Sequence, residues 1–353
     1  SAASDVYKRQ GLFKNRIYVS ADFFDKRTRN LLYEQNLPNT TGFSKFWTNL
    51  GKVRFWGYEL ELTTRNIVKK NFSWESKLVL SYQQNKVLKL PDNGIAKNRT
   101  GGIALGDGTF FGGIAEGEPL NRFYGYVATG IIETEEQAAN ANYDALSRLP
   151  QKGAKRVGDY EWADRNGDGQ ITTADQFCLG VTVPPFTGGL QNSFRLKNWT
   201  LSLYLDWATG HSIFDESYSR YFYGTFTNNY ALAKDVLKAW KKPGDKTKYA
   251  KFYANDSNWG NDNYNRRATN TFTYKGDYLC LREITLQYSL PSKLFTKVGL
   301  KGVTLTVSGN NLYYFTEVKG ISPEAGSSTT YDGDVFYNYP PIRRFSFGVR
   351  LIF

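Results

Sequence analysis

The residues with the clearest chemical potential lie in an acidic segment, residues 164–175. Oxygen-bearing side chains occupy its first, third and fifth positions, Gly169 follows for a sharp turn, and the segment ends at Asp175. Oxygen donors at this spacing are typical of an EF-hand calcium loop, in which one main-chain carbonyl also ligates. The sequence therefore predicts a structural Ca²⁺ site whose ligands are Asp164, Asn166, Asp168, Gln170 (through its carbonyl) and Asp175.

Two features of this segment depart from an EF-hand. Asp175 stands where an EF-hand has the longer bidentate Glu, and the flanking residues do not form a convincing helix pair. The alternative interpretation is a solvated acidic turn without a metal. If Ca²⁺ binds, we expect it to make a long loop rigid rather than to act as a sensor.

Catalytic chemistry is not indicated. His211 is the only histidine, so the chain contains neither a Ser-His-Asp triad nor an HExxH zinc motif. Nothing in the sequence positions the neighbouring carboxylates Asp215 and Glu216 around a scissile bond. We predict that the chain is not an enzyme, that it has no catalytic residues, and that it has no cofactor besides Ca²⁺.

The composition excludes two further classes. The net charge is +12, but the basic residues are spread over loops and strand ends without an RNA-binding signature, so nucleic acid is not an expected partner. Mean hydropathy is −0.51, and no run approaches the roughly 20 apolar residues of a transmembrane helix. Strands that alternate apolar and polar residues escape such a scan. The 16% aromatic content suits the interfacial girdles of a membrane barrel and also sugar-binding surfaces.

Alternation of apolar and polar residues predicts eight strands. In the clearest one, Phe345, Phe347, Val349, Leu351 and Phe353 share one face of the last eleven residues. The other seven are predicted at residues 17–23, 58–62, 74–83, 190–195, 200–207, 283–288 and 303–308. About 9–11 residues with one apolar side are enough to cross a bilayer as part of a barrel.

The connections between these strands indicate how they are arranged. Compact links at residues 66–71, 197–198 and 291–302 alternate with long ones, as in outer-membrane barrels, where the short side is periplasmic. The alternation holds only if residues 90–185 form one extracellular insertion. We therefore expect that residues 124–131 do not span the membrane and that residues 133–149 form a helix within the insertion. Residues 1–10 match no later pattern and are interpreted as a non-native leader before the barrel part, residues 11–353.

Several segments together resemble the C-terminal part of SusC/RagA-type TonB-dependent transporters. They are GYELEL at 57–62, YGY at 124–126, GDY at 158–160, DRNGDG at 164–169, PPFTGGL at 184–190, LREITLQY at 281–288 and SGNNL at 308–312. Their order and spacing after about Gly11 carry the resemblance. It implies an all-β fold, an antiparallel transmembrane β-barrel arc of about eight strands from a larger barrel of about 22 strands, with long extracellular loops.

The resemblance also implies a function and partners. The family lies in the outer membrane of Gram-negative bacteria, works beneath a SusD-like surface lipoprotein, and imports oligosaccharides or peptides with energy relayed by TonB. This chain departs from the family by lacking the plug, the TonB-contacting segment and most N-terminal strands. It is therefore expected to form a part of the barrel wall, with outer-membrane lipid against its outer side. The implied water-filled lumen is lined by Glu59, Glu61, Glu75, Lys77, Asp206, Gln287 and Arg350.

Two alternatives stay open at this point. Aromatic residues of the external loops either stack on sugar rings or pack the loops; they are Trp162, Trp240, Tyr249, Tyr253 and Trp259. The rival for the whole chain is a soluble, calcium-stabilised, β-rich carbohydrate-binding module. That rival predicts apolar strand faces that converge on a shared core, whereas a barrel turns them outward as a belt about 25 Å tall.

Overall fold

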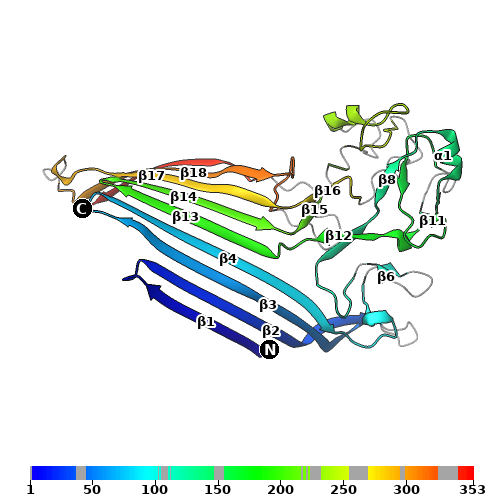
Figure 1. Cartoon of the computed structure of the whole chain (residues 1–353), viewed down its shortest axis with the longest axis horizontal. Coiled ribbons are helices and arrows are strands. Elements are labelled where there is room, and N and C mark those ends of the chain that lie inside the picture. Colours follow the sequence, from blue (N-terminus) through cyan, green and yellow to red (C-terminus); the bar gives the residue numbers. More distant parts are fainter. Residues whose placement is uncertain are drawn as a thin grey trace.

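A computed structural model describes residues 2–36, 45–101, 103–104, 110–111, 113–146, 155–215, 218–219, 222, 232–253, 269–294, 299–324 and 341–353. Its main element is an antiparallel sheet of nine strands in the order β1-β2-β3-β4-β13-β14-β17-β18-β19 (Figure 1). The strands are β1 (Ala2–Leu12), β2 (Ile17–Asn36), β3 (Lys45–Val68), β4 (Phe72–Lys89), β13 (Phe186–Leu196), β14 (Trp199–Thr209), β17 (Tyr278–Ser289), β18 (Gly302–Thr316) and β19 (Arg344–Ile352). Each strand of the sheet lies beside the one before it, which is the up-and-down arrangement of membrane barrels.

All eight predicted strands are present, as β2, β3, β4, β13, β14, β17, β18 and β19. The ninth strand, β1, pairs with β2 in continuous register from Ala2 opposite Arg27 to Leu12 opposite Ile17. β1 contains residues 2–10, which show no alternation in the sequence; their non-native origin stays a prediction. Within the described residues the sheet does not close, because β1 and β19 are its two outer strands.

The predicted alternation of short and long connections is confirmed. The strand ends joined by residues 13–16, 69–71, 197–198 and 290–301 lie at one end of the sheet, and those joined by the long connections 90–185, 210–277 and 317–343 lie at the other. Lys197 adopts a positive φ of 51°, which the two-residue turn between β13 and β14 requires. These two ends are called the turn end and the loop end below.

The long connections build a separate layer of short elements beyond the loop end (Figure 1). Its strands are β5 (Ile103–Ala104), β6 (Phe110–Phe111), β7 (Arg122–Gly125), β8 (Ala128–Ile131), β9 (Tyr143–Asp144), β10 (Tyr160–Trp162), β11 (Gln170–Ile171), β12 (Phe177–Val181), β15 (Ser212–Phe214) and β16 (Thr273–Lys275), and its helices are α1 (Glu135–Asn140), η2 (Ala96–Asn98), η3 (Thr173–Asp175) and η4 (Lys234–Lys238). One more short helix, η6 (Ser292–Leu294), lies in the link between β17 and β18. Within the described ranges, no helix is both long and apolar enough to cross a membrane.

The segment 124–131 does not join the large sheet, as expected. It contributes to β7 and β8, which pair with β12 and β10 inside the loop layer. The helix predicted for residues 133–149 is much shorter. α1 starts at the capping box of Thr134 and Gln137 and ends at Asn140, because the chain then extends and Tyr143 pairs with Gln170 between β9 and β11. Residues 147–149 lie outside the described part of the chain.

Apolar side chains are buried in the loop layer but exposed on one face of the sheet. The loop layer has a conventional core, formed by Tyr126, Tyr160, Trp162, Ile171, Phe222, Ala239, Ala250 and Phe272. In the sheet, by contrast, Leu286 is 40% exposed, Leu305 41% and Phe347 83%. Among the described residues no second layer covers this apolar face, so these residues do not form the shared core that a soluble module requires.

Candidate functional site

Strand pairing sorts the side chains of the sheet onto two faces. Leu62, Leu78, Leu190 and Leu205 form one row across four neighbouring strands, and the adjacent row on the opposite side of the pleat contains Glu61 and Asp206. The seven residues expected to line the lumen all lie on this second, polar face: Glu59, Glu61, Glu75, Lys77, Asp206, Gln287 and Arg350.

The apolar face carries aromatic residues in two bands. Near the turn end Trp74 stacks on Phe194, with 5.6 Å between the ring centroids. Near the loop end the ring centroids of Phe23 and Tyr58 are 5.1 Å apart. Tyr82 pairs with Tyr58 in the loop-end band and follows Trp74 by eight residues on β4, so the bands are about 26 Å apart along the strand. For a strand tilted by about 40°, this spacing is roughly 20 Å in height, so the two bands lie close to the edges of the apolar belt of about 25 Å in outer-membrane barrels.

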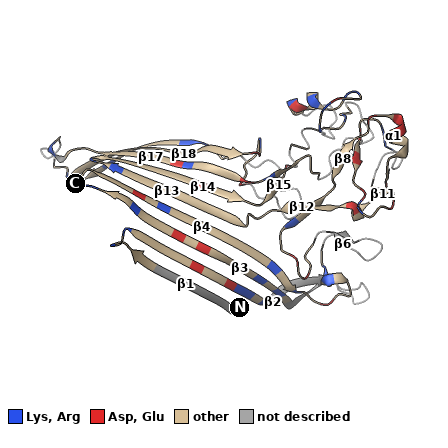
Figure 2. Cartoon of the chain, viewed as in Figure 1, with Lys and Arg blue, Asp and Glu red and all other residues tan. Residues whose placement is uncertain are grey.

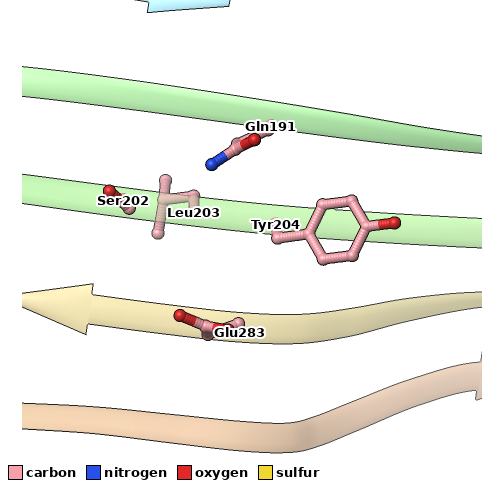
Figure 3. Close-up of a pocket in the computed structure, with 5 residues that line it drawn as sticks. All are labelled: Gln191, Ser202, Leu203, Tyr204 and Glu283. Carbon is pink, nitrogen blue, oxygen red and sulfur yellow. The ribbon is translucent and has the colours of Figure 1, made fainter. Parts of the chain in front are cut away.

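The polar face is hollowed around the middle of β4, β13 and β14. The hollow has a volume of about 480 Å³ and is lined by Lys77, Val79, Ser81, Thr187, Gly188, Gly189, Gln191, Tyr204, Asp206, Trp207 and Tyr278. Gly189 leaves room for the Tyr204 ring, because a Cβ at this position would lie 2.9 Å from the hydroxyl oxygen of Tyr204 and displace that side chain. Figure 3 shows Gln191, Tyr204 and Glu283, from three neighbouring strands, at a second, smaller hollow alongside.

Ion pairs between β3 and β4 border the hollow. Lys77 lies 2.9 Å from Glu61, and Arg65 lies 3.7 Å from Glu75. All four side chains are substantially exposed, so each pair contributes at most about 1 kcal/mol to stability. Their charged groups therefore remain available to polar ligands that pass along this face.

Arg282, for which the sequence pattern predicts no role, connects several groups on the polar side of the sheet. In the pairing with β14, Tyr204 lies opposite Glu283 and Leu205 opposite Leu281, so a β-bulge leaves Arg282 as an extra residue in β17. Its guanidinium donates two hydrogen bonds of 2.7 Å to the carboxylate of Asp206. It also donates to Asn311 and Tyr314 of β18 and to Glu324 beyond that strand. Arg282 thus ties two neighbouring strands and the following loop segment to β17.

The acidic segment 164–175 lies in the loop layer, away from the hollow (Figure 1). The carboxylate of Asp164 accepts hydrogen bonds from the backbone N–H groups of Gly167 at 2.7 Å and Gly169 at 2.8 Å. These backbone donors, Gly169 first, lower the pKa of Asp164 below its usual value. Gly167 and Gly169 both adopt positive φ, which the tight turn requires.

The other predicted ligands share this segment but are engaged differently. Asp168 accepts from the backbone of Gln170 and from the side-chain amide of Asn166, both at 2.8 Å. Asp175 is fully buried and accepts from the backbone N–H groups of Arg165 and Thr172. Among the described residues, no group of three or more His, Cys, Asp or Glu side chains is arranged to hold a metal ion.

The external aromatics mainly pack the loops. Trp162 is 1% exposed and Trp240 3%, so neither offers a ring face to a sugar. Tyr249 stacks on Phe222 at 4.4 Å, and Tyr253 lies under the guanidinium of Arg156 at 3.8 Å. Loop packing is therefore confirmed for the two tryptophans, and Trp259 lies outside the described residues.

Comparison with known proteins agrees with this geometry. The sequence model of the family described as "TonB dependent receptor-like, beta-barrel" matches residues 7–206. The chain belongs to this family. TonB-dependent receptor P3 of Formosa agariphila is 30% identical over 355 residues, a match that covers 97% of this chain and 33% of the receptor. TonB-dependent receptor SusC of Bacteroides thetaiotaomicron is 24% identical, with 97% of this chain and 31% of SusC covered.

The solved structures lead to the same fold. A RagAB peptide transporter matches 99% of this chain and 35% of its own, with a TM-score of 0.73 and 20% identity. The chain thus spans about a third of the length of the TonB-dependent receptors that it matches. Family membership confirms the predicted location in the Gram-negative outer membrane and the prediction that the chain is not an enzyme, and it replaces the soluble carbohydrate-binding module as the interpretation.

Proposed function

We propose that this chain forms part of the wall of a TonB-dependent transporter that imports oligosaccharides or other oligomeric nutrients, such as peptides. The observation that carries the proposal is the two-faced sheet, with an apolar belt on one side and a hollowed polar surface on the other. In a barrel the polar face lines a water-filled passage, and its side chains contact the cargo.

The groups at the hollow suit a neutral, hydrogen-bonding oligomer. Gln191 offers both donors and acceptors, Lys77 offers donors, and Asp206 offers acceptors. The ring of Tyr204, 39% exposed beside Gly189, supplies an apolar surface on which a sugar ring or a peptide side chain can stack. SusC and a peptide transporter are both among the similar proteins, which supports either cargo.

The proposed partners follow from the same relatives. A SusD-like lipoprotein would sit over the loop layer, and TonB would act through a part of the receptor outside this chain. The loop layer supports the first proposal, because it is a packed structure with its own core rather than a set of isolated loops.

Substitution on the two faces of the sheet tests the transport proposal in the complete receptor. We expect Tyr204→Ala to slow uptake of the cognate oligomer several-fold, because its ring lines the hollow. The matched control is Tyr313→Ala, which removes a tyrosine that is 51% exposed on the apolar face. Uptake of labelled oligosaccharide and peptide libraries shows which class of cargo the receptor imports. If the Tyr204→Ala and Tyr313→Ala variants took up the cargo at the same rate, the proposal would be contradicted.

We also propose that residues 164–175 bind one Ca²⁺ as a structural ion. Support comes from Asp164, whose carboxylate the N–H groups of Gly167 and Gly169 fix within the turn, and from Ile171, which anchors the loop in the core of the loop layer. Asp168 and the carbonyl of Gln170 would complete the set. Asp175 would ligate only after giving up part of its bonding to Arg165 and Thr172.

Calcium protection against proteolysis tests this site in the complete receptor. We expect Ca²⁺ to slow cleavage within residues 90–185 several-fold and EGTA to reverse the effect. Asp164→Asn should abolish the protection. Asp245→Asn is the matched control, because Asp245 also accepts two backbone N–H bonds in a loop, from Lys241 and Lys242. Cleavage that is insensitive to Ca²⁺ would contradict the proposed site.

A further inference from the structure

A row of three cations crosses the apolar face of the sheet near its loop end. Strand pairing places Arg27 of β2 opposite Arg54 of β3, and Arg54 opposite Lys86 of β4. Each cation lies four residues beyond an aromatic residue of the loop-end band: Arg27 beyond Phe23, Arg54 beyond Tyr58 and Lys86 beyond Tyr82. Because four is an even number, each cation shares the face of its aromatic residue. Figure 2 shows basic segments gathered at the loop-side ends of β2, β3 and β4.

This row carries an excess of positive charge. Like charges directly opposite each other destabilise a sheet unless a counter-charge is present. Asp25 supplies one, 2.6 Å from Arg54 and 3.7 Å from Arg27. Lys86 is exposed and forms no ion pair within the described part of the chain. Three positive charges thus share one negative charge on a largely apolar face, and the next basic pair, Lys52 opposite Lys89, follows directly.

The geometry of Arg54 favours a further acceptor. Its Nε and Nη2 atoms donate to Asp25, and the guanidinium lies 4.8 Å from the ring centroid of Trp56. Asp25 and Trp56 hold the planar group in place, while no described residue accepts a hydrogen bond from Nη1, which can donate to an acceptor beyond the pair. An oriented guanidinium beside a free ammonium is a typical arrangement for binding a phosphate group.

The height of the row matches a lipid headgroup. Four residues beyond the aromatic band correspond to about 13 Å along the strand, or roughly 10 Å in height for a strand tilted by about 40°. That distance places the row in the polar region outside the hydrocarbon core. The loop end faces the exterior, because the short turns of outer-membrane barrels are periplasmic. The lipid at this height is lipopolysaccharide, whose lipid A carries phosphate groups.

We propose that Arg27, Arg54 and Lys86 bind a phosphate group of lipopolysaccharide in the outer leaflet. The bound phosphate neutralises the row and fixes the height of this part of the barrel in the membrane. The site is separate from the hollow on the polar face, so it does not depend on the proposed cargo or on transport.

Lipid A binding to the complete receptor in mild detergent, measured by native mass spectrometry, tests the site. The test variant R27Q/R54Q/K86Q removes the row, and the matched control R65Q/R195Q/R350Q removes three charges from the polar face. We expect the test variant to bind bisphosphorylated lipid A about tenfold more weakly or worse, and the control to bind within about twofold of the unsubstituted receptor. Dephosphorylated lipid A should bind all three proteins equally weakly.

Three results would overturn the proposal. Unchanged affinity in the test variant would show that the row makes no contact with phosphate. An equal loss in the control would show that only net charge matters. Tight binding of dephosphorylated lipid A would show that the acyl chains alone are recognised. If the triple variant does not fold, K86Q alone decides the question, since Lys86 is exposed and unpaired: weaker binding supports the site, and unchanged binding rejects it.

Discussion

The large sheet and the loop layer use the same kinds of apolar residue for opposite purposes. In the loop layer Trp162, Phe222 and Phe272 are almost completely buried against one another. In the sheet, Phe345, Phe347 and Val349 are each more than half exposed on one face. The difference reflects two surroundings: the loop layer must exclude water with its own side chains, while hydrocarbon covers the sheet.

This contrast explains why the two layers respond to different changes. Removing a large side chain from the loop core leaves a cavity, whereas lipid or detergent can fill the space left on the sheet. Placing a charge on the apolar face of the sheet is costly because hydrocarbon cannot solvate it. The following predictions use these differences, in order of decreasing effect.

The largest effect is expected for Trp162→Ala. Trp162 contacts Tyr126 and Tyr160, with ring centroids 6.0 and 5.3 Å away, so its removal should destabilise the loop layer by about 3–5 kcal/mol. Limited proteolysis of the complete receptor should show rapid cleavage in the loops while the barrel keeps its heat-modifiable migration in gels. Phe347→Ala is the control on the sheet and should change little. A loop layer that resists protease as before would contradict the contrast.

A somewhat smaller effect is expected for Leu205→Arg. Leu205 lies between Leu190 and Leu281 on the apolar face, so a cation there should cost about 2–4 kcal/mol in a bilayer. Urea titration of the receptor folded into vesicles measures this loss. The matched variant Ser202→Arg places the same side chain on the polar face of the same strand and should be tolerated. Equal losses would mean that the two faces do not differ in their surroundings.

Much of the sheet could be predicted from the sequence because period-two alternation is a local property. The parity of residues such as Glu61 and Lys77 alone predicts that they lie on the polar face, and strand pairing confirms this placement. The alternation of short and long links also identified residues 90–185 as one insertion. β1 gave no such signal, because its place depends on backbone pairing with β2 rather than on its own pattern.

The remaining features depend on contacts between distant residues. Ser76 and Asn192 interrupt the apolar face, and the structure explains them: Ser76 and the indole of Trp74 both donate to the side-chain oxygen of Asn192. The hollow depends on Gly189 lying opposite Asp206 and beside Tyr204, which no local pattern shows. α1 is short because pairing between β9 and β11 competes with helix extension. The hydrogen bonds to Asn192 and the pairing of β9 with β11 join residues far apart in the sequence, so no short segment of the sequence predicts them.

The bulge at Arg282 leads to the third prediction. Arg282→Lys keeps the charge but cannot make the two parallel bonds to Asp206, and we expect a loss of about 1–3 kcal/mol from this part of the sheet. Hydrogen exchange of β17 and β18 measures the loss in the complete receptor. Arg195→Lys is the control, on the same polar face but at an exposed strand end. Unchanged exchange in β18 would show that Arg282 does not hold the strands together.

The smallest effect is expected from acid, and it separates two aspartates of the loop layer. The pKa of Asp164 is lowered by backbone donors, first Gly169, so its contribution to stability is present above the ordinary aspartate pKa of about 3.9 and is lost as the pH falls below it. The pKa of Asp215 is raised by burial. Its contribution therefore has the opposite sign: it is present below about pH 3.9 and is lost as the pH rises through the folded-state pKa.

Hydrogen exchange followed from pH 6 down to about pH 2, corrected for intrinsic rates, should therefore separate the two sites. The amides of Gly167 and Gly169 should lose protection as the pH falls through the lowered pKa of Asp164, because the protonated carboxyl accepts their hydrogen bonds less well. The amide of Tyr218, which donates to Asp215, should keep its protection. Asp164→Asn should remove the pH dependence at the two glycines and leave Tyr218 unaffected. If both sites lost protection together in acid, global loosening of the loop layer would explain the result better than the two local environments.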